Sequence, residues 1–175
     1  MTHMSRSKDR QELYELLVRT HAAELYRFAY RLCGEHENAS DLVQEAYSEA
    51  WRSLDSLRQP EKARAWLFSI LRYRYAHLQR DNGRRETSVE PQELAEMAVD
   101  EKSGRLLEAI AGRDGLQKAL DGLDDRFKEP FLMVFLEGLT CAEAAEALGV
   151  PLGTVLSRIH RARHQLKSNL DRNEI

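Results

Sequence analysis

The chain of 175 residues has only two cysteines, no long apolar run and no alternation of apolar and polar residues of the kind that strands show. Cys33 and Cys141 lie far apart, outside any CxxC or Cys/His spacing, so we expect reduced, structural thiols and no metal site. No apolar stretch approaches the about 20 residues of a membrane helix, and the N-terminus lacks the apolar core of a signal peptide. These absences predict a cytoplasmic protein without strands.

Charge is strongly segregated along the chain, although the formal net charge is only −3. Residues 64–85 carry six arginines against the single Asp81, whereas residues 86–101 carry six acidic residues and no cation. The sign of each segment matters more for binding partners than the total charge. The basic segments are therefore compatible with nucleic-acid binding.

Residues 140–167 have the pattern of a helix, a tight turn and a second helix. Thr140 and Glu143 have the spacing of a capping box, in which each side chain satisfies an unpaired N–H of the first turn, so a helix should begin just after the threonine. Gly149 suits the positive φ that ends a helix, and Pro151 suits the start of the next one. This succession predicts a helix-turn-helix, a DNA-binding motif.

The second helix of this motif combines an apolar stripe with a polar surface. Its apolar residues recur at steps of four, three and four, so they should share one buried face. They are Val155, Ile159, Ala162 and Leu166. The remaining surface carries hydroxyl, imidazole and guanidinium groups, which suit phosphates and base edges. These groups belong to Thr154, Ser157, Arg158, His160, Arg161, His164 and Lys167.

The segment 1–85 is predicted to form three helices with short breaks. The first reaches Gly34, which we expect to end it. Asn38 is predicted to cap the second helix, whose exposed side is mostly acidic. Gln59-Pro60 interrupts the pattern before a third helix, which is expected over 63–79.

The rest of the chain divides into an acidic linker and a second helical part. Periodicity weakens over 86–112, so we expect a flexible linker with one short helix at 105–111. Helical spacing then restarts and continues through Pro130. The predicted fold is all-α, with two small helical domains at 1–85 and 113–175 joined by the linker.

Three motifs follow one another along the chain, DLVQEAYSEAW at 41–51, AWLFSI at 65–70 and GTVLSRIHRAR at 153–163. In this order and spacing they resemble the extracytoplasmic-function (ECF) group of σ70-family RNA polymerase sigma factors. The resemblance covers nearly the whole chain. It implies two helical domains and a linker too short to hold the middle domain of larger sigma factors.

The resemblance implies a partner for the acidic helix. In the family this helix docks on the coiled coil of the polymerase β′ subunit, which makes Asp41, Gln44 and Glu45 the expected contacts. Acidic and amide groups can pair there with arginines of a partner helix. The other implied partners are the β flap of core RNA polymerase, promoter DNA and an anti-sigma factor. We expect no membrane contact except through the anti-sigma factor. No catalytic group, cofactor or metal is expected, because the polymerase makes the RNA.

Two further surfaces match the DNA-binding segments of the family. The third helix and the following loop resemble the segment that melts and holds the −10 element, where arginines hold the single strand and aromatic side chains stack on bases. The matching positions are Arg72, Tyr73, Arg74, His77, Arg80 and Arg84. The second helix of the helix-turn-helix resembles the reader of the −35 element. Its matching positions are Thr154, Ser157, Arg158, His160 and Arg161.

The sequence departs from the pattern of many relatives at three positions. Relatives often have asparagine in place of Tyr73, an acidic residue in place of His77, and lysine or arginine in place of Leu156. Each change alters which base or phosphate can be contacted, so the promoter sequence stays undetermined. Two large aromatic residues nearby, Trp66 and Tyr75, are expected in the core instead.

Three alternatives compete with the sigma-factor interpretation. A zinc enzyme would use His160 and His164, but Arg161 stands where HExxH has its glutamate, and a guanidinium opposes a bound cation. A helix-turn-helix repressor with an N-terminal dimerisation bundle does not explain why Asp41, Gln44 and Glu45 precede a basic, aromatic helix. A sigma mimic that sequesters an anti-sigma factor does not need basic residues in both domains.

The acidic linker at 86–112 has two possible roles. It fits either a nucleic-acid mimic in the polymerase channel or a solvated tether.

Overall fold

The computed structural model describes residues 2–81 and 113–173, and within these ranges it contains helices and helical turns without a strand. The all-α prediction is confirmed. The expected linker at 86–112, its short helix and Arg84 lie outside the described residues. The exact domain boundaries stay a prediction. Within the same ranges, no helix combines the length and apolarity that crossing a membrane requires.

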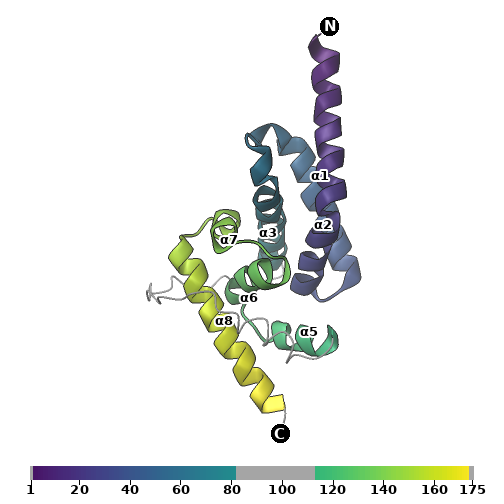
Figure 1. Ribbon diagram of the computed structural model, residues 1–175. Helices are drawn as coiled ribbons and strands as arrows, with labels where there is room; N and C mark the ends of the chain where they lie inside the picture. The colour runs from purple at the N-terminus through teal and green to yellow at the C-terminus, as the bar shows by residue number, and fades with distance from the viewer. Residues whose placement is uncertain (1, 82–112, 174–175) are drawn as a thin grey trace.

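The N-terminal part consists of three long helices. They are α1 (Thr2–Cys33), α2 (His36–Ser53) and α3 (Ala63–Asp81), with short 3-10 turns η1 (Leu54–Ser56) and η2 (Pro60–Lys62) between the last two. Gly34 ends α1 with a φ of 77°, as predicted. Figure 1 shows the N-terminal end of α1 extending beyond the other two helices.

The start of α2 corrects the predicted cap at Asn38. The helix begins at His36, and the preceding Glu35 is the extended N-cap residue with φ −132° and ψ 140°. Because Gly34 reverses the chain directly after α1, the first turn of α2 is already formed when the chain reaches Asn38. The Asn38 amide donates instead to Glu35 Oε2 at 2.9 Å.

A continuous apolar layer joins α1, α2 and α3. Leu25 and Phe28 of α1 and Leu42 of α2 are fully buried, as are Phe68 and Leu71 of α3. The Phe28 and Phe68 rings lie 5.1 Å apart between centroids. Burial of one large apolar side chain stabilises a fold by about 1.5–3 kcal/mol, so this layer fixes the three helices relative to one another.

The C-terminal part, described over residues 113–173, contains four helices and a π-helical turn in that range. They are α5 (Arg113–Asp121), α6 (Asp125–Phe131), η3 (Leu132–Leu136), α7 (Cys141–Leu148) and α8 (Leu152–Asn173). Pro130 lies inside α6, as the sequence predicted, but the π-helical turn that follows it was not anticipated.

The predicted helix-turn-helix is confirmed as α7 and α8. The Glu143 amide N–H donates to Thr140 Oγ1 at 3.1 Å and the Thr140 amide N–H donates to Glu143 Oε2 at 2.7 Å, which completes the capping box. Gly149 ends α7 with a φ of 65°. The predicted apolar stripe of α8 is buried throughout, at Val155, Ile159, Ala162 and Leu166.

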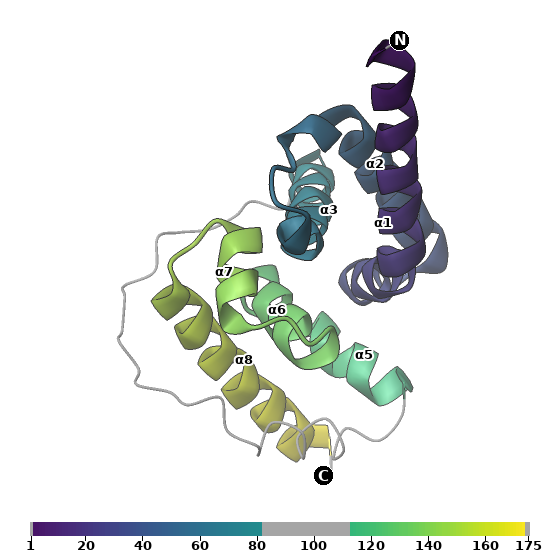
Figure 2. The ribbon, with the colours of Figure 1, turned by 45° about the horizontal axis from the view of Figure 1, so that its top comes forward.

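The two parts pack directly against each other, an arrangement that sequence reasoning left undetermined. Helix α7 contacts α3 as well as α8, and Figures 1 and 2 both show α7 beside α3. Three buried alanines of α7, Ala144, Ala145 and Ala147, provide the small surface that lets neighbouring helices approach closely. The buried apolar side chains of both parts form one cluster.

We predict that Thr140→Ala lowers the free energy of unfolding by about 1 kcal/mol, because α7 loses the side-chain acceptor that caps its first turn. Thr140→Ser keeps the hydroxyl and is the matched control. Urea unfolding followed by circular dichroism measures both. Equal unfolding free energies for the alanine and serine variants would contradict a stabilising cap.

We further predict that Glu143→Gln destabilises the protein at neutral pH and does so less as the pH falls. The Thr140 backbone N–H holds the pKa of Glu143 below its ordinary value. Because the pKa is lower in the folded state, the carboxylate contributes stability above its unfolded pKa and loses it as pH falls through the folded pKa. Unfolding curves of both proteins at several pH values between neutral and acid measure the difference, which should narrow on acidification.

Candidate functional site

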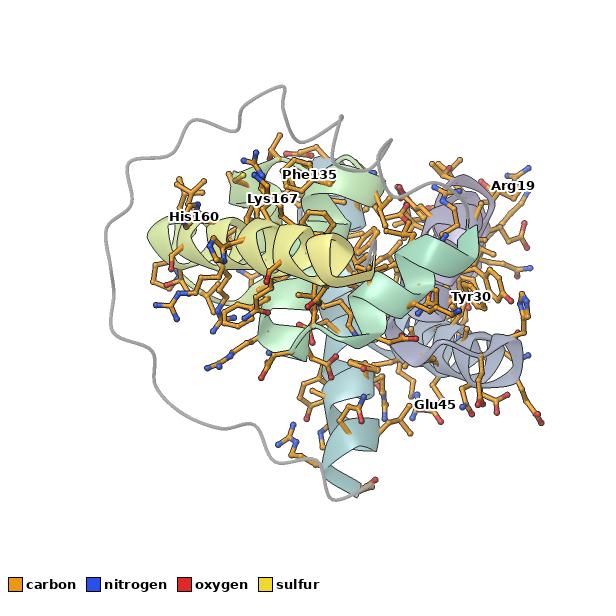
Figure 3. All side chains as sticks on the ribbon, turned by 90° about the horizontal axis from the view of Figure 1, so that it is seen from below. Arg19, Tyr30, Glu45, Phe135, His160 and Lys167 are labelled. Atoms are coloured by element: carbon orange, nitrogen blue, oxygen red, sulfur yellow. The ribbon has the colours of Figure 1, made fainter. Side chains whose placement is uncertain are left out.

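An acidic face lies on the exposed side of α2. Asp41, Gln44 and Glu45 are spaced by three and four residues, so they share one side of the helix, and all three are exposed. They line an open depression together with Ser48, Arg52 and Arg74. Figure 3 shows Glu45 on the far side of the molecule from His160 of α8. The residues that sequence reasoning grouped on this helix therefore do form a single surface.

Arg74 closes one side of this depression. Its Nη2 lies 2.6 Å from Glu49 Oε2 of α2, and the two side chains are 28% and 33% exposed. The guanidinium therefore ties α3 to the acidic helix. Its expected contact with −10 DNA stays a prediction, and in this structure the side chain is directed toward α2.

The outward side of α3 combines aromatic and basic groups. Tyr73, His77 and Arg80 follow one another at steps of four and three residues and are exposed. The Tyr73 ring is 54% exposed and meets the His77 ring edge-on, with 4.6 Å between centroids. Arg80 donates to the backbone oxygen of Ala76 at 3.3 Å. These three side chains form the α3 outer face, which presents an accessible ring beside a cation.

Arg72 lies on a different side of α3 and contacts the C-terminal part. Its Nε donates to Glu129 Oε2 of α6 at 3.1 Å. The side chain of Glu129 is only 8% exposed, so this ion pair is largely removed from solvent. The structure therefore separates Arg72 from the side of α3 that carries Tyr73, His77 and Arg80.

Tyr75 is buried, as the sequence predicted, whereas Trp66 is only half-buried. The Tyr75 hydroxyl donates to the backbone oxygen of Leu32 at 3.3 Å and lies 3.0 Å from Asp125 Oδ2 of α6. Burial and the Asp125 carboxylate raise the pKa of Tyr75, which keeps it a neutral donor. Tyr75 of α3 therefore links α1 and α6 through its neutral hydroxyl.

The polar side of α8 carries the expected −35 residues. His160 is exposed, whereas Thr154, Ser157, Arg158 and Arg161 are half-buried. All five lie outside the buried stripe of the helix, and Figure 3 shows His160 and Lys167 projecting from α8. The structure thus brings these residues together on one helix surface.

The two cysteines are half-buried free thiols. Burial raises the pKa of Cys33 to about 11, and the carboxylates of Asp125 and Glu35 act in the same direction. Burial also raises the pKa of Cys141. A thiol with a raised pKa is a poor nucleophile at neutral pH, which agrees with the expected structural role.

Among the residues that the structure describes, no three His, Cys, Asp or Glu side chains are arranged to hold a metal ion. The pair formed by His160 and His164 therefore has no third ligand within those ranges.

Comparison with known proteins assigns both parts of the chain. Residues 17–85 match the family model of Sigma-70 region 2, and residues 119–168 match that of Sigma-70, region 4. The ECF RNA polymerase sigma factor SigL of Mycobacterium tuberculosis is 32% identical over 165 residues, covering 90% of this chain and 89% of SigL. The chain belongs to the ECF sigma factors. Sigma factors are transcription initiation factors.

A second relative is longer than this sigma factor. The ECF RNA polymerase sigma factor SigE of Mycolicibacterium smegmatis is 36% identical over 159 residues, which cover 90% of this chain but 61% of SigE. The chain therefore spans less than two thirds of that relative's length.

Two solved structures resemble this sigma factor over most of its length. The sigma factor RpoE of Bartonella quintana, solved in complex with the anti-sigma factor NepR, has a TM-score of 0.65 and 28% identity, covering 94% of this chain and 98% of RpoE. CnrH, solved in complex with the cytosolic domain of CnrY, has a TM-score of 0.67 and 28% identity, covering 92% of this chain and 89% of CnrH.

Sequence reasoning missed three acidic residues of this sigma factor that engage its basic side chains. Glu49 pairs with Arg74, and the buried Glu129 and Glu137 pair with Arg72 and Arg27 of the N-terminal part. A signal for Glu129 was present, because Lys128-Glu129 interrupts an otherwise apolar run at 127–136. Charged residues are seldom fully buried unless they are paired, so this interruption indicates a distant partner.

We predict that Tyr75→Phe lowers the unfolding free energy of the sigma factor by about 1 kcal/mol, because the buried hydroxyl no longer donates to Leu32 and Asp125. Tyr73→Phe removes the same hydroxyl from the exposed outer face of α3 and should leave stability unchanged. Urea unfolding compares the two variants. An equal effect of both would show that the Tyr75 hydrogen bonds contribute nothing specific.

Proposed function

We propose that this sigma factor binds core RNA polymerase through α2, holds the opened −10 element with α3 and reads the −35 element with α8. The observation that carries the proposal is the presence of three polar surfaces, each on a helix whose opposite side is buried. They occur in a chain that matches regions 2 and 4 of the family.

The acidic face of α2 has the chemistry for docking on a basic protein surface. Asp41, Gln44 and Glu45 are exposed, so a partner's arginines can approach them. Exposed charges of this kind accelerate association and set specificity more than they add affinity. We assign this face to the β′ coiled coil, and the C-terminal part to the β flap.

The α3 outer face suits single-stranded DNA. The exposed ring of Tyr73 can stack on an unpaired base, an interaction worth about 1–3 kcal/mol per base. The edge of the His77 ring supports Tyr73, and Arg80 provides a cation for a phosphate nearby. Arg72, Arg74 and Arg84 complete the proposed −10 set.

The polar surface of α8 suits duplex DNA. Arg158, Arg161 and His160 offer donors for phosphates and guanine edges, whereas Thr154 and Ser157 offer hydroxyls. Leu156 is half-buried and carries no charge where many relatives have a cation. We assign it a contact with an apolar base edge such as a thymine methyl group.

The proposed mechanism is binding without catalysis, in the cytoplasm where the polymerase works. The polymerase performs the chemistry, and this chain positions it. Both structural neighbours were solved in complex with another protein, which for RpoE is the anti-sigma factor NepR. We extend this class of partner to the present chain. The repressor alternative loses support, because the helices that it needs for dimerisation match region 2.

We predict that adding the protein to core polymerase on a pool of genomic fragments produces new transcript starts with a shared −35 and −10 pair. Glu45→Lys should reduce these starts about tenfold, which corresponds to about 1.4 kcal/mol of lost docking energy. Sequencing of transcript starts and co-purification with core polymerase measure the effect.

The matched control is Glu61→Lys, which makes the same charge change at an exposed position away from the acidic face. It should leave both measurements unchanged. Absence of new starts with the unmodified protein would contradict the proposed function. Equal starts with Glu45→Lys and Glu61→Lys would contradict the docking assignment alone.

A further inference from the structure

We propose that the C-terminal part of the free sigma factor restrains its own −10 surface by placing a buried carboxylate, Glu129, against Arg72. The carboxylate occupies the place of a DNA phosphate, so the two parts must separate before Arg72 can hold promoter DNA. This inference rests on the proposed function, because it assigns Arg72 to the −10 element.

Among the residues that the structure describes, three ion pairs between the two parts share one polarity. Each pairs a cation of the N-terminal part with an acid of the C-terminal part. Arg27 Nη2 lies 2.9 Å from Glu137 Oε2, Lys62 Nζ lies 3.0 Å from Glu146 Oε1, and Arg72 Nε lies 3.1 Å from Glu129 Oε2. The contact is therefore formed by a basic surface and an acidic surface, as a contact with nucleic acid would be.

Arg64 adds a connection of another kind between the parts. Its Nη2 and Nε lie 2.7 and 3.0 Å from Glu24 Oε2 of α1, which holds the guanidinium in place. The same guanidinium donates to the backbone oxygens of Glu137 and Gly138, in the turn that precedes α7. Arg64 thus fixes this turn beside α3, where Figure 2 shows α7.

Two of the three acids at this contact, Glu129 and Glu137, are unusually buried. Glu129 and Glu137 are 6% and 7% exposed, whereas most glutamates lie in solvent. Burial raises the pKa of Glu137, although the hydrogen bond from Arg27 opposes this shift. Removing a carboxylate from water offsets much of the attraction that the ion pair gains. The pairs therefore determine which surfaces meet, while their net stabilisation stays small enough for a binding partner to overcome.

Guanidinium groups recognise carboxylates and phosphates with the same donor geometry. Glu129 therefore competes directly with a phosphate for Arg72. The α3 outer face stays exposed in this arrangement, with Tyr73 at 54%. The restraint is consequently partial, and the free protein should bind single-stranded DNA weakly rather than not at all.

The test measures binding of the full chain to a fluorescent single-stranded DNA pool of random sequence, by anisotropy at fixed salt. The double variant Glu129→Gln with Glu137→Gln should raise the affinity for this DNA about fivefold. That factor is at the lower end of the affinity changes typical of coupled sites. The matched control is Glu15→Gln with Glu61→Gln, which changes the net charge equally at exposed positions. Adding Arg72→Ala to the first pair should abolish the gain. The same affinity as the control, or a gain that survives Arg72→Ala, would overturn the inference.

A second measurement does not depend on altering buried residues. Lys62 and Glu146 are 51% and 52% exposed, so Lys62→Glu leaves the core intact while it creates like-charge repulsion at the contact. Small-angle scattering of the full chain should show a larger radius of gyration, and Glu146→Lys in the same chain should restore it. An unchanged radius would overturn the inference. New transcript starts with the unmodified protein would still support the proposed function, so the two failures are distinguishable.

Discussion

Packing of α3 on two sides sets the positions of all three proposed surfaces. Its apolar residues face α1 and α2, as the contact between Phe68 and Phe28 shows, and α7 packs against another side. What remains accessible on the helix is the narrow outer face with Tyr73 and its neighbours. The same packing aligns α2 so that its acidic face points outward, and it places α7 of the helix-turn-helix beside α3.

The charged groups at the contact between the two parts contribute selectivity rather than strength. Apolar burial supplies most of the energy that holds helices together, whereas buried ion pairs add little after desolvation. Unpaired buried charges are costly, however, so alternative arrangements that leave Glu129 or Glu137 without a cation are disfavoured. The ion pairs therefore select which surfaces of the two parts meet, while the shared apolar cluster supplies most of the energy of the contact.

Local features could be predicted from the sequence. A prediction was wrong where a nearby turn changed the start of a helix. The capping box at Thr140 and the stop at Gly149 need only neighbouring residues, and both were confirmed. The predicted cap at Asn38 was wrong, because the reversal at Gly34 starts α2 earlier. Similarly, helical spacing identified the acidic face of α2 and the polar side of α8, since both depend only on residues of one helix.

The sequence by itself determined the helices, their buried stripes and the membership of the family. Only the tertiary structure decided which charged residues meet. Arg72 and Glu129 are 57 residues apart in the chain, and Arg27 and Glu137 are 110 residues apart. Helical periodicity repeats every three to four residues and carries no information on such separations. The pairing of these groups follows from how α1 and α3 pack against α6 and η3, because that packing brings distant side chains within hydrogen-bonding distance.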